Sequence, residues 1–361
     1  MDEKEQNTGE ENHFSPGENK SEGLDEQASV TPPPLEEDLS LPVDHTAFKE
    51  EVELITELKN ECAKIIVGQE DIIEKMLVCI IADGHILLEG APGIAKTLTG
   101  RTLAKTIDSD FSRIQFTPDL MPSDIIGTSI YKMKEGTFEF VKGPIFSNII
   151  LIDEINRAPA KTQSALFEVM EERQISFDSH TYKMDFPFLV IATQNPIEQE
   201  GTYRLPEAQL DRFLMKIQMS YPAFEVEMDI LKRYKNQIGN VDLNPLRKIL
   251  NKEKLIGLRK SASEVKVEDQ MLHYITALVQ ETRNNAKVFL GASPRASLGI
   301  LKAAKAVALM AGREFIIPDD IQYIASDVLS HRIILSPDTE IQGENEKQVI
   351  EEIIRETEVP R

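Results

Sequence analysis

The sequence of 361 residues contains no tryptophan, only two cysteines and six scattered histidines. It also lacks an apolar run of about 18 residues, so no membrane insertion is expected. Cys62 and Cys79 lie too far apart for a C-x-x-C motif and are predicted to be small core residues in a reducing compartment. No H-E-x-x-H or G-x-S-x-G motif is present, so zinc-protease and serine-hydrolase chemistry find no support.

Basic residues are scarce: 40 Lys and Arg stand against 61 Asp and Glu, for a net charge of −21. Residues 1–45 hold 13 acidic residues and 2 lysines, which is −11 and leaves −10 for the rest. The acidic balance argues against a broad nucleic-acid or anionic-membrane surface, although it leaves room for a local basic pore. From this balance we expect no stable nucleic-acid partner. Because the N-terminus lacks a basic-then-apolar signal sequence, we expect a cytoplasmic protein.

Composition along the chain predicts five parts. Residues 1–45 are rich in Glu, Asp, Ser, Gly and Pro and are predicted to be a disordered acidic tail, either a solvating extension or a partner-binding arm. Residues 46–222 alternate apolar strands with helices, which favours an α/β domain. A helical connection over 223–266 is expected to follow, with short helical pieces over 238–266. A helical domain over 267–340 and a charged segment over 341–361 are expected next.

The most informative stretch is Gly90-Ala91-Pro92-Gly93-Ile94-Ala95-Lys96-Thr97. It lies between an apolar run, 85–89, and a predicted helix that starts near Leu98, which is the layout of a phosphate-binding loop. Glycines at 90 and 93 allow positive φ, so that backbone N–H groups can face one anion. The residue before Lys96 is Ala95, where the usual loop has glycine, and we expect it to adopt helix-like φ. Lys96 would reach the β- and γ-phosphates of a nucleotide, and Thr97 would bind Mg²⁺.

A second apolar run, 149–152, ends in Asp153-Glu154. Carboxylates at the end of a buried parallel strand face the ligand crevice. Asp153 is predicted to hold the Mg²⁺ shell through water, and Glu154 to orient and polarise the attacking water.

Three further side chains are candidates for catalysis. Asn195 follows the apolar strand 186–192, where an amide can bind the γ-phosphate or the water. Arg212 is expected at the end of a helix over 205–213, where it either reaches a neighbouring subunit or forms a surface ion pair with Asp211 or Glu207. Arg295 follows Ser293-Pro294, an N-cap and first-turn pair, and is expected to point from the helix start towards the phosphates.

Other segments leave two interpretations open. Val67-Gly68-Gln69 joins two predicted helices and either packs against a purine or is a plain turn. Extended pieces at 129–133 and 137–141 predict a hairpin, and 174–184 predicts another. The aromatic side chains of the first hairpin, Tyr131, Phe138 and Phe140, either contact a substrate in a pore or pack on their own domain.

Taken together, the motifs resemble the MoxR family of AAA+ ATPases over about residues 48–335. The resemblance rests on segments 90–97, 151–158, 192–198, 205–213 and 291–295, which occur in that order. It implies a P-loop AAA+ parallel-sheet domain followed by a small all-α lid domain. The two hairpins look like the helix-2 insert and pre-sensor-1 hairpin of that clade, in which Ala is common at the position of Ala95.

The resemblance also implies a function. Family members hydrolyse ATP with Mg²⁺ in rings, so a hexamer is expected, with active sites between subunits. By position, Asp153 and Glu154 match Walker B, Asn195 matches sensor 1, Arg212 matches an arginine finger supplied in trans, and Arg295 matches sensor 2. Family members act as chaperone-like remodellers of protein clients, commonly proteins with a von Willebrand A domain.

Three alternatives stay open on sequence grounds. A nucleic-acid motor of the same clade is disfavoured by the acidic balance. A metal-chelatase motor subunit would share the fold, but the stretches 193–198 and 156–158 look more like MoxR. A nucleotide-gated scaffold without catalysis would need neither Glu154 nor Arg212.

Overall fold

The computed structural model describes residues 47–177, 180–196, 202–203, 205–236, 239 and 241–360. The predicted acidic tail 1–45, the hairpin-turn residues Asp178 and Ser179, and the pair Ile197 and Glu198 of the third motif lie outside the described residues. Within them, no helix is long and apolar enough to cross a bilayer.

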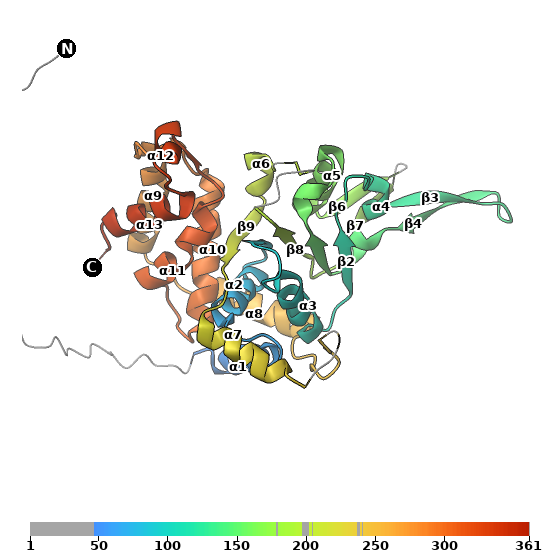
Figure 1. The fold of residues 1–361 in the computed structure, drawn as a ribbon, viewed down its shortest axis with the longest axis horizontal. Helices are drawn as coiled ribbons and strands as arrows, with labels where there is room; N and C mark the ends of the chain where they lie inside the picture. The colour runs from blue at the N-terminus through green and yellow to red at the C-terminus, as the bar shows by residue number, and fades with distance from the viewer. Residues whose placement is uncertain are drawn as a thin grey trace, which may run out of the picture. The chain divides into compact units, whose positions relative to one another are not determined.

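The centre of the α/β domain is a sheet whose described strands run parallel in the order β2-β5-β8-β1-β9 (Figure 1). In chain order they are β1 (His85–Gly90), β2 (Phe111–Gln115), β5 (Ile149–Asp153), β8 (Leu189–Gln194) and β9 (Phe213–Met219). The middle strands are continuously apolar and buried, as strands covered on both faces must be. Parallel pairing brings Glu89 beside Gln194 and Gln115 beside Asp153, so the carboxyl ends share one edge.

Helices cover both faces of this sheet. One face carries α1–α3 together with the C-terminal helices α8–α11 in a single apolar core. The other face packs on α5 and the short helix α4. The helices that precede β9 are α1 (Lys49–Ala63), α2 (Glu70–Ile81), α3 (Lys96–Thr106), α4 (Pro122–Ile126), α5 (Ala160–Glu172) and α6 (Glu207–Leu210), with 3₁₀ turns at Pro144–Phe146 and Ile155–Arg157.

The C-terminal part is mainly helical. Its elements are α7 (Phe224–Tyr234), α8 (Lys252–Glu264), α9 (Asp269–Asn284), β10 (Val288–Leu290), α10 (Pro294–Met310), α11 (Pro318–Leu329), β11 (Ile334–Leu335), α12 (Pro337–Ile341) and α13 (Glu346–Glu356). Small residues on α10, such as Ala296, Gly299 and Ala303, are fully buried or nearly so, which lets α10 approach α11 closely. The described chain from 47 onward belongs to one contact unit that spans Val43–Arg361, and the predicted domain boundaries within it stay predictions.

Two hairpins leave the sheet domain. The first, β3 (Gly127–Lys132) and β4 (Thr137–Lys142), pairs Ser129 with Phe140 and confirms the predicted hairpin. The second, β6 (Gln174–Phe177) and β7 (His180–Lys183), confirms the hairpin predicted over 174–184. Phe140 packs on Phe177 and Tyr182 of the second hairpin, with ring centroids 4.7 and 4.8 Å apart. By contrast, Tyr131 and Phe138 contact each other and are 51% and 70% exposed.

Two of the helix predictions were wrong. Only Glu207–Leu210 of the helix expected over 205–213 is helical, and Phe213 already belongs to β9. The chain leaves the helix because Phe213 pairs with His85 of β1, and the Arg332 guanidinium holds the same segment through the carbonyls of Asp211 and Phe213. Conversely, the connection 238–266, expected to hold short helical pieces, contains the 13-residue helix α8, whose N-cap Asn251 accepts from the Lys254 amide at 2.9 Å.

Both cysteines are buried and reduced, as predicted, and burial raises the pKa of the Cys62 thiol to about 12.

Glu61, on α1, is 1% exposed and accepts hydrogen bonds from Lys64 at 2.7 Å and from the Arg247 guanidinium at 3.0 and 3.1 Å. Burial alone would raise the pKa of Glu61, but these hydrogen bonds outweigh it and lower the pKa from 4.5 to about 2.

The Glu61 contacts predict a pH-dependent contribution to stability. Because the folded-state pKa is the lower one, the stabilisation is complete above pH 4.5 and is lost as the pH falls towards 2. We expect Glu61→Gln to lower the free energy of unfolding by about 3 kcal/mol at pH 7. The gap in unfolding free energy between the wild type and the variant should narrow below pH ~4.5. Thermal and urea unfolding between pH 7 and pH 3 measure it. Glu57→Gln, which removes an exposed partner of Arg247, should cost under about 1 kcal/mol. A gap that stays constant with pH would contradict the assignment.

Candidate nucleotide site and arginine cluster

The glycine-rich segment forms the turn from β1 into α3, and its glycines serve different purposes. Gly93 has φ of 83°, and a Cβ there would meet no heavy atom within 4 Å, so the turn is open on that side. Gly90 has no positive φ; a Cβ on it would lie 2.5 Å from the Met219 carbonyl oxygen, so glycine is required by close approach to β9. The turn ends at the 11-residue helix α3, whose first-turn N–H groups have no acceptor within the helix and whose dipole places partial positive charge beside the turn.

Ala95, the residue before Lys96, corrects a sequence expectation. Its φ of 67° and ψ of 21° are left-handed, not helix-like. That conformation costs an L-residue about 1–2 kcal/mol, which explains why the usual loop has glycine at this position. Ala95 adopts this left-handed conformation, and its side chain adds only a methyl group to the loop.

Lys96 starts α3, and its side chain lies along the carboxyl edge of the sheet. Its ammonium donates to the Gly90 carbonyl oxygen and, at 3.1 Å, to that of Gln194. Both acceptors are neutral carbonyl oxygens, so an anionic phosphate can replace them as the hydrogen-bond acceptor of the ammonium. The position between the ends of β1 and β8 is suited to the phosphates of a nucleotide.

Thr97 and Asp153 meet at the same edge and form a set of oxygen donors. The Thr97 hydroxyl donates to one carboxylate oxygen of Asp153 at 2.7 Å, and Arg113 Nε donates to the other at 2.6 Å. Among the described residues, no group of three or more His, Cys, Asp or Glu could hold a metal. One hydroxyl and one carboxylate fit Mg²⁺, which keeps several waters and takes its remaining ligands from phosphate oxygens.

Glu154 follows β5 in a left-handed backbone conformation, with φ of 59°. Its carboxylate accepts from Gln115 Nε2 at 2.7 Å and from Arg157 at 3.0 Å, while its amide donates to Thr193 Oγ1 at 3.0 Å. A non-glycine residue held at positive φ beside a binding loop is typical of a functional site. Asn195 follows β8 at the same edge and is 4% exposed.

The segment Val67-Gly68-Gln69 is joined to the loop by one side chain. Gln69 donates to the Ile94 carbonyl at 3.1 Å and accepts from the Thr99 hydroxyl at 2.9 Å. Gly68 has φ of 69°, and a Cβ there would collide with Val226 of α7. The segment therefore lies beside the loop and α7, where the predicted purine contact would have to be.

Arg212 and Arg295 lie at the other edge of the sheet. Arg212 precedes β9, whose first residue Phe213 pairs with His85 at the start of β1. The end of α5 is fixed there too, because His85 Nε2 lies 3.3 Å from the Met170 carbonyl oxygen. The glycine-rich loop follows the other end of β1. At about 3.3 Å per strand residue, that end lies about 15–20 Å from the His85 end. Figure 1 shows α6, which leads into β9, and α7, which follows β9, at opposite ends of the strands.

Both arginines bind carboxylates of their own chain. The Arg212 guanidinium donates to the Phe167 carbonyl at 2.9 Å and to Glu171 at 3.2 Å, and Arg295 donates to Glu171 at 2.7 Å. The ion pairs predicted for Arg212 with Asp211 or Glu207 are replaced by the one with Glu171. Arg295 does not point towards its own loop but lies 3.7 Å from Asp211, which also binds the buried Arg332 at 2.6 Å. We call Glu171, Asp211, Arg212, Arg295 and Arg332 the arginine cluster.

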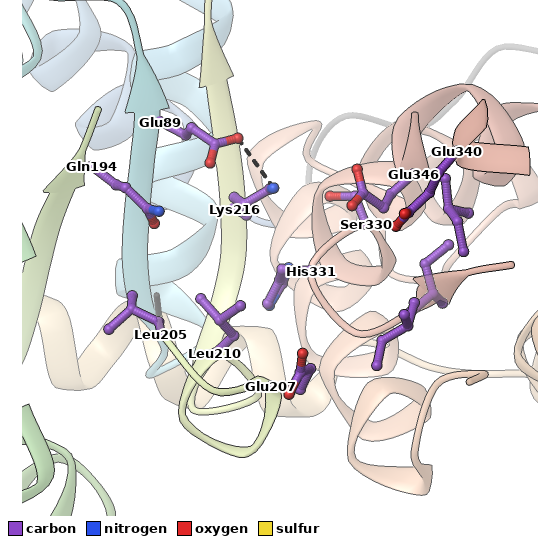
Figure 2. Close-up of a pocket in the computed structure, with 13 residues that line it drawn as sticks. Glu89, Gln194, Leu205, Glu207, Leu210, Lys216, Ser330, His331, Glu340 and Glu346 are labelled. Carbon is purple, nitrogen blue, oxygen red and sulfur yellow. Dashed lines mark ion pairs between the residues drawn. The ribbon is translucent and has the colours of Figure 1, made fainter. Parts of the chain in front are cut away.

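A cavity of about 190 Å³ lies between the sheet and the C-terminal helices. Figure 2 shows Glu89, Gln194 and Lys216 on its strand side, with Ser330, His331 and Glu340 on the other side. Glu89 and Lys216 form an ion pair at 3.1 Å, and both side chains are largely buried. Because Gln194 also accepts from Lys96, this cavity adjoins the loop without containing it.

Sequence reasoning missed several partners of the predicted residues. Arg113 and Gln115 occupy alternate positions of β2, a spacing that could have placed both on one side of the strand next to Asp153. Thr193 belongs to the third motif, but nothing in the sequence says that its hydroxyl meets the Glu154 amide. Glu171 is one of several acidic residues on α5, and its contacts come from residues 41 and 124 positions away.

Comparison with known proteins identifies the family. A model described as the ATPase family associated with various cellular activities (AAA) matches residues 85–215, and one described as the AAA lid domain matches 280–353. The chain is 46% identical over 310 residues to Chaperone MoxR1 of Mycobacterium tuberculosis, which covers 83% of this chain and 81% of that protein. The chain belongs to the MoxR family of AAA+ ATPases. Its parallel sheet with the glycine-rich loop is the P-loop core, and the C-terminal helices include the lid.

Other MoxR-like sequences and structures agree. The Bacillus subtilis protein YeaC, named as uncharacterized, is 48% identical over 297 residues, which cover 82% of this chain and 92% of YeaC. A crystal structure of a candidate ATPase from Cytophaga hutchinsonii matches with a TM-score of 0.80 and 45% identity, over 87% of this chain and 97% of that one. ATPase activity is thus supported at the level of the family.

The position of Lys96 predicts its contribution to binding. We expect Lys96→Ala to weaken ATP binding roughly 10- to 100-fold, since it removes a charge-assisted hydrogen bond to the phosphates. Titration with a fluorescent ATP analogue measures this. Lys105→Ala, an exposed change in the last turn of the same helix, is the control and should bind normally. Near-normal affinity of the Lys96 variant would refute the phosphate-loop assignment.

Proposed function

We propose that this chain hydrolyses Mg²⁺-bound ATP at sites shared between neighbouring copies in a ring, and uses the cycle to remodel protein clients. The observation that carries the proposal is the separation of the two halves of the site. Lys96, Thr97, Asp153 and Glu154 share the carboxyl edge of the sheet, whereas Arg212 and Arg295 lie at the amino edge. One chain cannot bring both halves to one nucleotide.

At the carboxyl edge, each residue has a role that its contacts support. The loop amides and Lys96 bind phosphates, while Val67, Gly68 and Gln69 lie where a purine would pack. Thr97 and Asp153 supply the oxygen ligands for Mg²⁺, which, when bound, offsets negative charge on the phosphates. Glu154 orients water once its carboxylate leaves Gln115 and Arg157, and Asn195 supplies an amide at the same edge.

The arginines complete the neighbour's site. Arg212 and Arg295 contact the same carboxylate, that of Glu171, so their guanidinium groups lie side by side and can face a neighbouring chain together. Placed against a loop on the next copy, they would stabilise the charge that develops on the transferred phosphoryl group. This assigns Arg295, like Arg212, a role in trans. A head-to-tail contact of this kind generates a ring when the rotation between copies closes, and the family resemblance favours a hexamer.

Chaperone-like action is supported by kinship to the protein named Chaperone MoxR1. The β3–β4 hairpin supplies a surface for a client, since Tyr131, Met133 and Phe138 are all at least half exposed. Clients with a von Willebrand A domain are the partners that the family resemblance favours. Proteins rather than nucleic acids fit these exposed apolar side chains on a chain of net charge −21.

The role of Glu154 predicts a separation of binding from turnover. Glu154→Gln should bind ATP as tightly as the wild type but hydrolyse it roughly 10²-fold or more slowly, because the positioned base is lost. Steady-state phosphate release and equilibrium ATP binding measure the two effects. Glu168→Gln, an exposed change on α5, should match the wild type in both. Unchanged turnover in Glu154→Gln would show that another group orients the water.

The same variant tests the client. Affinity purification of Glu154→Gln with ATP should retain client and nucleotide together, and von Willebrand A domain proteins should be enriched over the same purification with ADP. Enrichment of nucleic acid instead would favour the motor alternative.

The shared site predicts complementation between defective chains. Arg212→Ala and Arg295→Ala should each bind ATP but hydrolyse it poorly. When either is mixed with Lys96→Ala under conditions of subunit exchange, some interfaces combine an intact loop with intact arginines, so activity should exceed the sum of the separate chains. Steady-state ATPase across mixing ratios measures this, with ring assembly confirmed. Strict additivity would rule out the shared site.

A further inference from the structure

The arginine cluster joins the core to the C-terminal helices. Glu171 lies in the last turn of α5, while Asp211 and Arg212 precede β9, so all three belong to the core. Arg295 starts α10, and Arg332 follows α11. Arg212 and Arg295 do not belong to one helix or strand, so the spacing of their guanidinium groups depends on side-chain contacts across this junction.

Glu171 and Asp211 supply those contacts. One oxygen of Glu171 accepts from Arg295 at 2.7 Å and the other from Arg212 at 3.2 Å, so a single carboxylate carries one guanidinium on each side. Asp211 does the same between Arg295, at 3.7 Å, and Arg332, at 2.6 Å. The order is therefore Arg332–Asp211–Arg295–Glu171–Arg212, with charges that alternate in sign.

Burial changes along this order. The Arg332 side chain is 3% exposed and also binds the carbonyls of Leu214, Phe213 and Asp211, so this end is fixed. Arg295 and Glu171 are 45% and 37% exposed, so the other end faces outward. Three arginines and two carboxylates leave one positive charge, which suits a polyphosphate brought by another chain. If Glu171 were neutral, the excess would be two, and the paired guanidinium groups would repel each other.

We infer that Glu171 is a positioning residue for ATP hydrolysis, which holds Arg212 and Arg295 at one spacing for the nucleotide on the neighbouring chain. The inference rests on the proposed shared site but adds a residue that does not itself contact the nucleotide. Exposed ion pairs contribute little to stability. The contribution of Glu171 is therefore to geometry, and a misplacement of about 1 Å can cost up to about 10²-fold in rate.

The test is Glu171→Gln, which keeps the shape of the side chain and removes its charge. We expect a kcat roughly 10- to 100-fold lower, an unchanged KM for ATP, and a melting temperature within about 2 °C of the wild type. Glu172→Gln is the matched control, because Glu172 is the exposed neighbour on α5 and forms no ion pair with the described residues. An unchanged or increased kcat in Glu171→Gln would overturn the inference.

Mixing separates a positioning defect from a folding defect. Glu171→Gln has an intact loop, and Lys96→Ala has an intact arginine cluster, so a mixture of the two should recover activity beyond additivity. Glu171→Gln mixed with Arg212→Ala should not, since both lack a working cluster. If Arg212→Ala recovers with Lys96→Ala but Glu171→Gln does not, the role of Glu171 is wrong and the shared site stands. If neither recovers, the shared site itself fails.

Discussion

The direction of the strands is the constraint on which the rest of the site depends. Because β1 runs from His85 to Gly90, the glycine-rich turn and the N-terminus of α3 must lie at its carboxyl end. Because β9 pairs with β1 in parallel, Arg212 must lie at the opposite edge. The length of a strand, about 15–20 Å, then separates the phosphate-binding half from the arginine half. This separation makes a second copy a chemical requirement of the proposed hydrolysis.

Within one chain, the charged groups of both halves already have partners. Lys96 donates to backbone carbonyls, Asp153 binds Arg113, and Glu154 binds Gln115 and Arg157. Arg212 and Arg295 share Glu171. At the carboxyl edge, substrate binding therefore exchanges one set of hydrogen bonds for another, and only ligands with concentrated negative charge, together with a divalent cation, compensate for the contacts that are given up. In the proposed shared site, Arg212 and Arg295 keep Glu171 between them and reach the neighbour's nucleotide with their remaining N–H groups. Such pairing favours hydrolysis only after nucleotide and neighbour are both in place.

The sequence predicted the parts of this site that depend on local order. The apolar runs before Gly90 and Asp153 specify buried strands, and parallel strands bring their ends together, so Lys96, Thr97 and Asp153 could be placed without coordinates. Ala95 was misjudged because its left-handed φ is set by the turn and not by its own preference. The helix over 205–213 was overestimated because Phe213 pairs with His85, a residue distant in sequence, and so belongs to β9. Glu171 could not be found, since its two partners lie 41 and 124 residues further along the chain and on different elements.

The central claim, that the arginines serve the nucleotide of a neighbouring copy, can be measured directly. An electron cryomicroscopy structure of Glu154→Gln assembled with ATP and Mg²⁺ would locate the guanidinium groups of Arg212 and Arg295 relative to every γ-phosphate. We predict hydrogen-bond distances, about 2.7–3 Å, to the nucleotide on the adjacent chain and about 15 Å or more to the nucleotide of the same chain. Arginines that contact the nucleotide bound by their own loop, or no nucleotide in a closed ring, would contradict the account.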